Sequence, residues 1–322
     1  MGRAKRIPYG VSDFIDIIER NQYYVDKTMY IPKLEDEPDA LFFIRPRRFG
    51  KSLFISMLRA YYDIKRKDKF DKLFGNLWIG SHPTENQGKY QVLFLDFSKI
   101  GGSIDQLEEN FNAYCNECID SFIETYQEYY PERVVESVLK AKTAARKLNA
   151  IGIAAEKKNL PLYLIVDEYD NFTNVVLNEQ GEEVYTALTH ASGFYREIFK
   201  VFKGMFSKIF MTGVSPVTLD DLTSGFNIGW HISTKPAFNQ MLGFSTEDVR
   251  ELFTYYKENG EIRPDSDVEA IIEEMKPWYD NYCFSKSALK TQSKVFNSDM
   301  VFYYLRNYRE TGEGPENMID RK

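Results

Sequence analysis

The chain has 322 residues, of which 43% are hydrophobic and 15% aromatic, a composition that is typical of a folded globular protein and excludes an intrinsically disordered one. Its 41 basic and 48 acidic side chains give a net charge of −7, which argues against a protein that binds polyanions over its whole surface, although a local basic stripe could still bind nucleic acid. The sequence contains no run of about 18 apolar residues, so we expect no membrane span.

The start of the chain and its cysteines indicate the compartment. Residues 1–6 include several basic side chains, but no apolar stretch follows them, so we expect no secretory signal peptide. Three cysteines cannot form a framework of disulfides, which favours a reducing environment. We therefore predict a cytoplasmic protein without a membrane partner.

Short helices are predicted near residues 12–20 and just before residue 40. Beyond them, four short apolar runs predict strands, at residues 40–44, 91–97, 162–166 and 208–212. Helical spacing of apolar residues lies between these runs, over residues 52–62, 104–129 and 131–158. Short apolar strands that alternate with long helices are typical of a parallel sheet with both faces covered. The sequence therefore predicts an α/β fold.

Strand signals become rare after about residue 238, and helical patterns replace them. Three helices are predicted, each opened by a serine as N-cap, over Ser245–Glu258, Ser266–Asp280 and Ser298–Tyr308. We therefore place a domain boundary near residue 235. It separates an α/β domain, residues 1–235, from a small helical lid domain, residues 236–322, and two domains also suit a chain of this length.

The segment from Arg45 to Ser52 follows a predicted strand and opens a predicted helix, which is the position of a phosphate-binding Walker A loop. Because backbone N–H groups at a helix start bind phosphate, the candidate ATP-binding residues are Arg47, Arg48, Phe49, Gly50, Lys51, Ser52 and Leu53. Lys51 would reach the β- and γ-phosphates, and the Ser52 hydroxyl would hold Mg²⁺. Arg45 replaces the first glycine of the usual motif.

A second motif ends the third predicted strand, where Asp167 and Glu168 follow the apolar run. Asp167 would hold Mg²⁺ opposite Ser52, and Glu168 would act as the base that activates the attacking water. Thr212 ends the fourth strand and is either a catalytic sensor of the γ-phosphate or simply a β-branched strand residue. Because the carboxyl ends of parallel strands share one crevice, these motifs predict a single site for ATP and Mg²⁺.

On these motifs the chain resembles the AAA-ATPase-like proteins found widely in anaerobic bacteria. The strongest match is the arginine-rich loop, residues 45–53, and further matches lie at residues 7–14, 24–28, 95–98, 166–170, 212–216, 243–245 and 278–284. The resemblance covers nearly the whole chain. It implies a P-loop NTPase fold of the AAA-like (ASCE) type, and it makes Arg45 a trait of the family rather than a damaged motif.

Members of this family often continue into a C-terminal nuclease-like domain, which we expect to be absent here. Pro264-Asp265 followed by Glu274-Met275-Lys276 nominally matches the nuclease motif. Apolar residues recur there at helical spacing, however, so Glu274 and Lys276 would face different directions and could not share a metal. We therefore predict that this match is accidental.

Further interpretations concern single side chains. Among the loop arginines we expect Arg48 to face the triphosphate, and Arg45 to be structural in a buried pair with an acidic residue. Cys115 and Cys118 lack further zinc ligands nearby, so we interpret them as a reduced helix face. An aromatic group, Trp278, Tyr279 and Tyr282, is either core or a surface beside adenine, and we favour the core.

The sequence thus favours an ATPase in which Mg-dependent hydrolysis changes the orientation of the lid relative to the α/β domain. One alternative is a nucleotide-binding scaffold or sensor with little hydrolysis, against which the presence of both Asp167 and Glu168 argues. The other is the motor half of a DNA-processing or defence system, with the nuclease on another chain. The candidate partners are therefore ATP, an unidentified protein or nuclease, and nucleic acid, which the net charge does not support.

Overall fold

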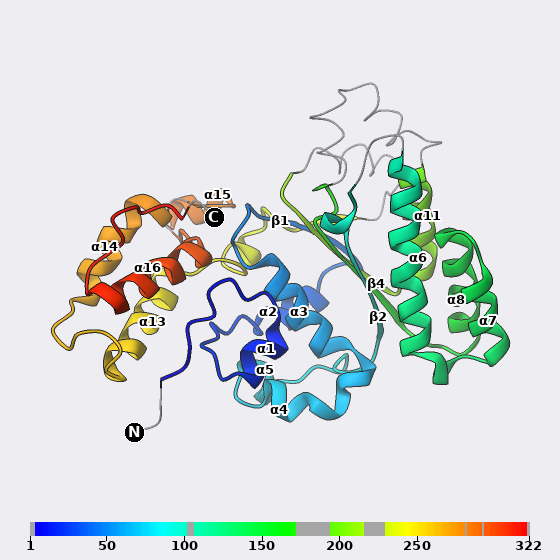
Figure 1. Cartoon of the computed structure of the whole chain (residues 1–322), viewed down its shortest axis with the longest axis horizontal. Coiled ribbons are helices and arrows are strands. Elements are labelled where there is room, and N and C mark those ends of the chain that lie inside the picture. Colours follow the sequence, from blue (N-terminus) through cyan, green and yellow to red (C-terminus); the bar gives the residue numbers. More distant parts are fainter. Residues whose placement is uncertain are drawn as a thin grey trace.

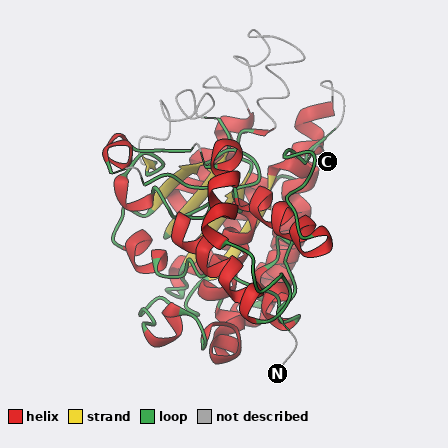
Figure 2. Cartoon of the chain, turned by 90° about the vertical axis from the view of Figure 1, so that its left-hand side faces the viewer, coloured by secondary structure: helices red, strands yellow, loops and turns green. Residues whose placement is uncertain are grey.

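The computed structural model describes residues 4–101, 106–171, 194–215, 229–280, 282–291 and 293–320, and of residues 194–197 only the backbone. A five-stranded sheet forms its centre, and its strands lie among the surrounding helices (Figures 1 and 2). None of the helices in these ranges is long and apolar enough to cross a lipid bilayer.

All five strands are parallel, in the order β2-β3-β4-β1-β5. Their bounds are Ala40–Ile44 (β1), Gln91–Asp96 (β2), Leu162–Asp167 (β3), Lys208–Gly213 (β4) and Trp230–His231 (β5). The four predicted strands are confirmed to within one residue at each end. The sequence missed β5, because two exposed residues carry no alternation of apolar and polar side chains.

Alternate residues of each strand contribute to two separate cores, one on each face of the sheet. In β1, Ala40 and Phe42 pack into one core, and Leu41 and Phe43 into the other. One face is covered by α6 (Leu107–Thr125), α7 (Glu132–Lys140), α8 (Ala144–Lys157) and α11 (Phe194–Met205) (Figure 1). The other face is covered by α1 (Phe14–Glu19), α2 (Tyr30–Glu35), α3 (Lys51–Tyr62), α4 (Phe70–Phe74) and α5 (Trp78–Ser81). The predicted parallel sheet, buried on both faces, is confirmed.

The long helix predicted over residues 131–158 is wrong in one respect, since the chain forms two helices there. Ala141 and Thr143 have extended backbone, and they separate α7 from α8. The Thr143 side chain accepts a hydrogen bond from the Arg146 N–H, so it caps the second helix. Short 3₁₀ helices occur elsewhere in the chain, at Ile64–Lys69, Phe97–Lys99, Gln127–Tyr129 and Pro236–Phe238.

Residues 236–320, which we call the C-terminal part, contain four further helices. They are α13 (Thr246–Glu258), α14 (Val268–Tyr279), α15 (Lys286–Lys290) and α16 (Ser298–Thr311), and α13, α14 and α16 lie together beside the sheet region (Figure 1). A third core holds α13, α14 and α16 together. Ser245 caps α13 in a capping box, as predicted. The other two predicted serine caps are wrong, because Asp267 and Asn297 cap α14 and α16.

Candidate functional site

The loop of residues 45–50 joins β1 to α3 and turns through two left-handed backbone conformations. Arg48 has φ +69° and Gly50 has φ +85°. Gly50 is the N-cap of α3, where a residue with a Cβ would be strained by its positive φ. The left-handed backbone conformation at the start of α3 therefore favours glycine at position 50.

Every carbonyl group of residues 45–49 accepts a hydrogen bond. Lys51 Nζ donates to the first two, Arg45 O at 3.1 Å and Pro46 O at 3.2 Å. The C-terminal part supplies the other donors: Asn297 Nδ2 to Arg47 O (3.4 Å), Ser298 Oγ and Asp299 N to Arg48 O (3.3 Å each), and Gly243 N to Phe49 O (3.3 Å). The loop carbonyl groups are therefore held partly by Lys51 and partly by the C-terminal part.

The backbone N–H groups of residues 47–50 find no acceptor in the part of the chain that the structure describes. The N–H groups of Lys51, Ser52 and Leu53 follow in the first turn of α3, where no helix carbonyl can reach them. Unpaired N–H groups at a helix start, together with the helix dipole, form an anion-binding site. The loop thus has the donor arrangement that phosphate requires.

A cavity of about 280 Å³ opens beside this loop. Its lining includes Arg47, Arg48, Gly50, Lys51, Ser52, Leu53 and Glu168, so the structure brings most of the predicted site residues together. Ser298, Asp299 and Phe302 of α16 line its other side. The sequence analysis missed these α16 residues, because nothing in the local pattern around residue 298 points to a loop so far away in the chain.

Lys51 and Glu168 face each other across the cavity. Lys51 Nζ lies 3.5 Å from Glu168 Oε1, and the Lys51 side chain is almost fully buried. Burial raises the pKa of the Glu168 carboxyl, Lys51 opposes this shift, and the nearby Asp167 and Asp170 add to it. A raised pKa brings a carboxylate closer to the range in which it can take a proton from water.

The Asp167 carboxylate, at the end of β3, accepts hydrogen bonds from the start of α3 and from the end of β4. Its Oδ2 accepts a 2.6 Å hydrogen bond from Ser52 Oγ, and its Oδ1 accepts one of 2.6 Å from Thr212 Oγ1. The Ser52 hydroxyl and the Asp167 carboxylate are oxygen ligands of the kind that Mg²⁺ prefers, so this pair fits the predicted metal. The described residues contain no group of three or more His, Cys, Asp or Glu that could hold a metal.

Hydrogen bonds hold the segment that directly follows Glu168. Glu168 has φ +51°, an uncommon conformation for a residue with a side chain. Directly after it, Tyr169 N donates to Thr212 O at 3.0 Å, and the buried Asp170 carboxylate accepts from the N–H groups of Val214 and Ser215. Asp170 therefore holds the turn after β4, a role that the sequence analysis did not assign.

Arg45 is fully buried, as a structural residue should be, but its partners differ from those expected. Its guanidinium donates to the carbonyl groups of Ile44 (2.8 Å), Ser233 (2.9 Å) and Phe238 (2.8 Å). It also lies over two rings, 4.1 Å from the centroid of Phe43 and 3.9 Å from that of Phe284. The predicted acidic partner is thus wrong: carbonyl oxygens and aromatic faces take its place. Burial lowers the pKa of Arg45 to about 9.

The other two loop arginines have different surroundings. Arg48 pairs with carboxylates of the C-terminal part, since Nε lies 3.9 Å from Asp299 Oδ2 and Nη1 lies 3.8 Å from Asp320 Oδ2. Arg47 is exposed at the cavity, and within the described ranges it forms no ion pair or side-chain hydrogen bond. Of the two, Arg47 is therefore the one with its guanidinium available to a ligand.

A second, mainly apolar hollow of about 60 Å³ adjoins the first. Pro8, Gly50, Leu53, Ser298 and Phe302 line both spaces. The lining of the second also includes residues 23–25 and 241–244 together with Lys27, Phe49 and Phe54, and the rings of Tyr23, Tyr24, Phe49 and Phe244 are part of it. The Phe49 ring packs edge-on against the Tyr282 ring, with 4.7 Å between the ring centroids, and this contact helps to fix Phe49 at the hollow.

The remaining side chains singled out from sequence divide between core and surface. Tyr279 is buried and Tyr282 packs against Phe49, but the core assignment of Trp278 is wrong, because that side chain is 55% exposed. Glu274 and Lys276 lie in α14 and not on a strand, which agrees with our interpretation of the nuclease match as accidental. Cys115 is buried in the core beneath α6.

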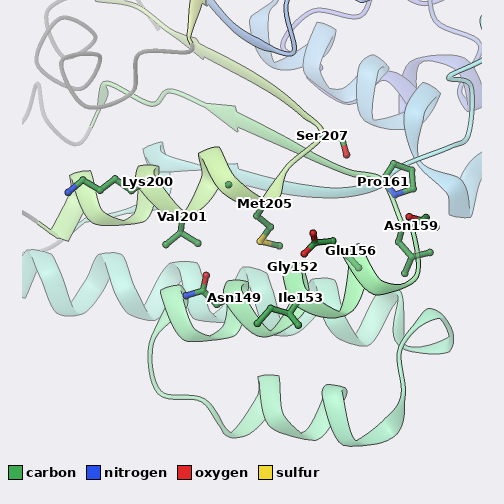
Figure 3. A pocket seen from close by; sticks show the side chains of 13 residues that line it. Asn149, Gly152, Ile153, Glu156, Asn159, Pro161, Lys200, Val201, Met205 and Ser207 are labelled. Atoms are coloured by element: carbon green, nitrogen blue, oxygen red, sulfur yellow. The ribbon is translucent and has the colours of Figure 1, made fainter.

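A larger groove of about 730 Å³ lies elsewhere, between α8 and α11 (Figure 3). Pro161 and Ser207 line it, and they precede β3 and β4, so the groove is at the amino ends of the strands. The loop, Asp167 and Thr212 lie at the carboxyl ends, where ligands of parallel α/β sheets bind. The groove is therefore separate from the candidate site.

Two known proteins are similar to this chain over most of its length. A curated relative, the uncharacterized protein in the vnfD 5′ region of Azotobacter chroococcum mcd 1, is 25% identical over 338 residues. The alignment covers 98% of this chain and 56% of the relative, so the chain spans about half of that protein's length. Among solved structures, the ORC2 protein of Aeropyrum pernix, determined as ADPNP–ADP complexes, matches 91% of this chain and 63% of its own, at 11% identity and a TM-score of 0.39.

The family comparison covers two thirds of the chain. A family model described as a predicted AAA-ATPase, AAA-ATPase_like, matches residues 8–223. That range contains the phosphate loop, Asp167, Glu168 and Thr212, and the parallel sheet around them is that of an α/β P-loop NTPase. The chain belongs to the AAA-ATPase-like family.

Proposed function

We propose that this protein binds MgATP at the loop of residues 45–53 and hydrolyses it. The observation that carries the proposal is the set of loop N–H groups that find no acceptor among the described residues, most of which belong to residues lining the same cavity as Lys51 and Glu168. Phosphate supplies the acceptors that these donors lack. A carboxylate base and a lysine on the same cavity suit hydrolysis of a phosphoanhydride.

Each residue has a role in this proposal. The loop N–H groups and Lys51 bind the β- and γ-phosphates, and Arg47 adds a charge-assisted contact from the cavity wall. When Lys51 turns to the phosphates, its contact with Glu168 weakens, and the carboxylate becomes free to accept a proton from the attacking water. Thr212 keeps Asp167 oriented through their hydrogen bond.

Ser52 and Asp167 are the residues that would hold Mg²⁺ in this proposal. When bound, the ion neutralises charge on the phosphate oxygens as the bond to the γ-phosphate breaks. The nucleoside would lie toward the apolar hollow beside Phe49, because that hollow shares five lining residues with the phosphate cavity. The flat faces of adenine stack on aromatic and apolar side chains, so ring and proline surfaces suit them.

The proposal includes the consequences of hydrolysis for the rest of the chain. Loss of the γ-phosphate would change the contacts between the loop and the C-terminal part, and so the orientation of the proposed lid beyond residue 235. A cytoplasmic location belongs to the proposal as well, and the free cysteines Cys115, Cys118 and Cys283 support it.

Isothermal titration with Mg²⁺ and a non-hydrolysable ATP analogue, followed by measurement of phosphate release from ATP, tests the proposal. Binding together with turnover that requires Glu168 supports an ATPase. Binding without turnover supports the second candidate, a nucleotide-dependent scaffold or sensor. The observation that favours this second candidate is the ion pair of Glu168 with Lys51, because a carboxylate paired with an ammonium group is a weaker proton acceptor for the attacking water.

A role as the motor half of a DNA-processing system is a third candidate, with a protein or nuclease partner. The basic run of residues 65–69 supports it weakly, since Lys65 pairs with Glu128 and Arg66 pairs with Asp63. DNA binding that weakens steeply with salt would favour this role, and DNA binding that is absent at low salt would exclude it.

A further inference from the structure

Arg48 of the phosphate loop contacts two separate segments of the C-terminal part. Its Nε lies 3.9 Å from Asp299 Oδ2, in the first turn of α16. Its Nη1 lies 3.8 Å from Asp320 Oδ2 and donates to the backbone oxygen of the same residue at 3.1 Å. One guanidinium thus joins the loop both to a helix start and to the stretch of residues 317–320.

Individual side chains attach this stretch to the rest of the protein. The hydroxyl of Tyr9 donates to the Asp320 carboxylate, Tyr303 donates to Asn317 O at 3.0 Å, and Tyr279 donates to Met318 O at 2.6 Å. No strand or helix includes residues 317–320. Its displacement would therefore break no sheet or helix, but it would exchange these side-chain contacts.

The ion pairs of Arg48 are loose. A charge-assisted hydrogen bond between a guanidinium and an oxygen anion has a length of about 2.7–2.9 Å, well below both distances. The Arg48 side chain is 33% exposed and that of Asp299 is 26% exposed, so water reaches this ion pair and it contributes little, whereas the Asp320 side chain is 9% exposed. A phosphate that bonds to the guanidinium directly would therefore compete successfully with either carboxylate.

The location of these groups makes such competition unavoidable. Arg48 and Asp299 both line the cavity of the phosphate loop. An anion that enters this cavity is attracted by Arg48 and repelled by Asp299. The same anion would gain Arg48 as a ligand only at the expense of its present partners.

We propose that Asp299 and Asp320 position Arg48 as a latch between the phosphate loop and the C-terminal part, and that the phosphates of a bound nucleotide displace both carboxylates. This inference rests on the proposed function, since it concerns the same cavity. Coupling between two binding equilibria is reciprocal. The carboxylates therefore weaken nucleotide binding, and a bound nucleotide weakens the attachment of residues 317–320.

The first test measures the Kd of the magnesium complex of a non-hydrolysable ATP analogue by titration calorimetry on the 322-residue chain. Asp299→Asn and Asp320→Asn should each lower the Kd roughly three- to tenfold. Glu316→Gln removes an equal charge from an exposed position that has no ion pair in the described ranges, so it is the matched control. It should leave the Kd unchanged.

Repeating both substitutions in an Arg48→Ala background separates competition from simple repulsion. If the carboxylates act by holding Arg48, they lose their effect once the guanidinium is gone, and the Kd should no longer change. If they act by repelling the triphosphate, the same tightening persists. Persistent tightening would overturn the latch.

Hydrogen–deuterium exchange provides a readout that needs no acidic variant. The analogue should accelerate exchange of the amides of residues 316–320 in the wild-type chain, and it should have no such effect in Arg48→Ala. Unchanged or slower exchange in the wild type overturns the latch while leaving nucleotide binding intact. A wild-type chain that does not bind the analogue at all overturns the proposed function, and the latch with it.

Discussion

Thr212 Oγ1 donates a 2.6 Å hydrogen bond to Asp167 Oδ1, so the end of β4 orients a carboxylate that belongs to β3. The other oxygen of that carboxylate accepts the hydrogen bond of Ser52. Thr212→Val keeps the size of the side chain but removes the donor, and Asp167 can then rotate. We expect kcat for ATP to fall by about tenfold while the Kd of MgATP changes little.

Thr28→Val is the matched control for this variant. Thr28 is also fully buried and donates to an aspartate, Asp26, at 2.7 Å, but that aspartate has no hydrogen bond to the cavity residue Ser52, which Asp167 has. Its substitution should lower the melting temperature without changing kcat per folded molecule. Equal losses of kcat in both variants would show that Thr212 acts only through stability.

Lys51→Met should weaken binding of MgATP by at least about 100-fold, which corresponds to about 2.7 kcal/mol. Lys51 is the ammonium group that lines the phosphate cavity, and methionine keeps most of its length without the charge. Calorimetric titration measures the effect. Lys147→Met is the control, because Lys147 is equally buried but pairs with Asp120 on the far face of the sheet. An unchanged Kd in Lys51→Met would refute its assignment.

Glu168→Gln should retain nucleotide binding and reduce turnover by about 100-fold or more, because the amide preserves the shape but cannot accept the proton. The same residue predicts the pH dependence of the reaction. Burial raises its pKa, so kcat/KM should decline as the pH falls through a value above the 4.3 of an ordinary glutamate. A pH–rate profile measures this decline. Turnover by Glu168→Gln at the wild-type rate would assign the base to another group.

The loop arginines should differ in what they contribute. Arg45→Ala should lower the free energy of unfolding of the nucleotide-free protein by about 3 kcal/mol, because three carbonyl groups and two aromatic rings lose their buried partner. Arg47→Ala should leave that free energy unchanged and weaken MgATP binding. Denaturation curves with and without MgATP measure both quantities. Equal losses of stability and of MgATP affinity in the two variants would contradict a structural role for Arg45 and a ligand-binding role for Arg47.

Asp280 should destabilise the fold at neutral pH. Its buried Oδ1 finds no hydrogen-bond partner among the described residues, and burial raises the pKa of the carboxyl, although Lys294 and Lys276 oppose the shift. A carboxyl with a higher pKa in the folded state stabilises that state below its unfolded pKa of about 3.9, and this contribution is lost as the pH rises through the folded pKa. Asp280→Asn should therefore raise the melting temperature by about 2–4 °C at pH 7. The gain should shrink toward pH 4, and a gain independent of pH would exclude ionisation as its cause.

The sequence predicted those features that depend on neighbouring residues. Strands appeared as short apolar runs, and Asp167 and Glu168 could be placed because they directly follow one of them. Ser245 was identified as a cap because it directly precedes a helical pattern, and the structure adds that Asp248, three residues further on, completes a capping box with it. At Ser266 and Ser298 the neighbouring Asp267 and Asn297 are equally good caps, and local preference could not choose between them.

The features that escaped prediction depend on contacts between distant segments. Nothing near Arg48 in the sequence indicates Asp299 or Asp320, and nothing near Arg45 indicates the carbonyl groups of Ser233 and Phe238. A buried arginine needs its donors satisfied, but carbonyl groups exist at every position, so the sequence cannot say which ones serve. The expectation of an acidic partner failed for this reason.

The donors from Gly243, Asn297 and Ser298 to the loop carbonyl groups also affect how the protein should melt. If the C-terminal part frays or unfolds first, three carbonyl groups of the loop lose their partners, and the loop is free to rotate its N–H groups out of the cavity. The phosphate loop and the C-terminal part should therefore open as one cooperative unit, although the sheet beneath the loop can remain folded. On heating, affinity for MgATP should disappear together with the helices beyond residue 243, before the β-structure is lost.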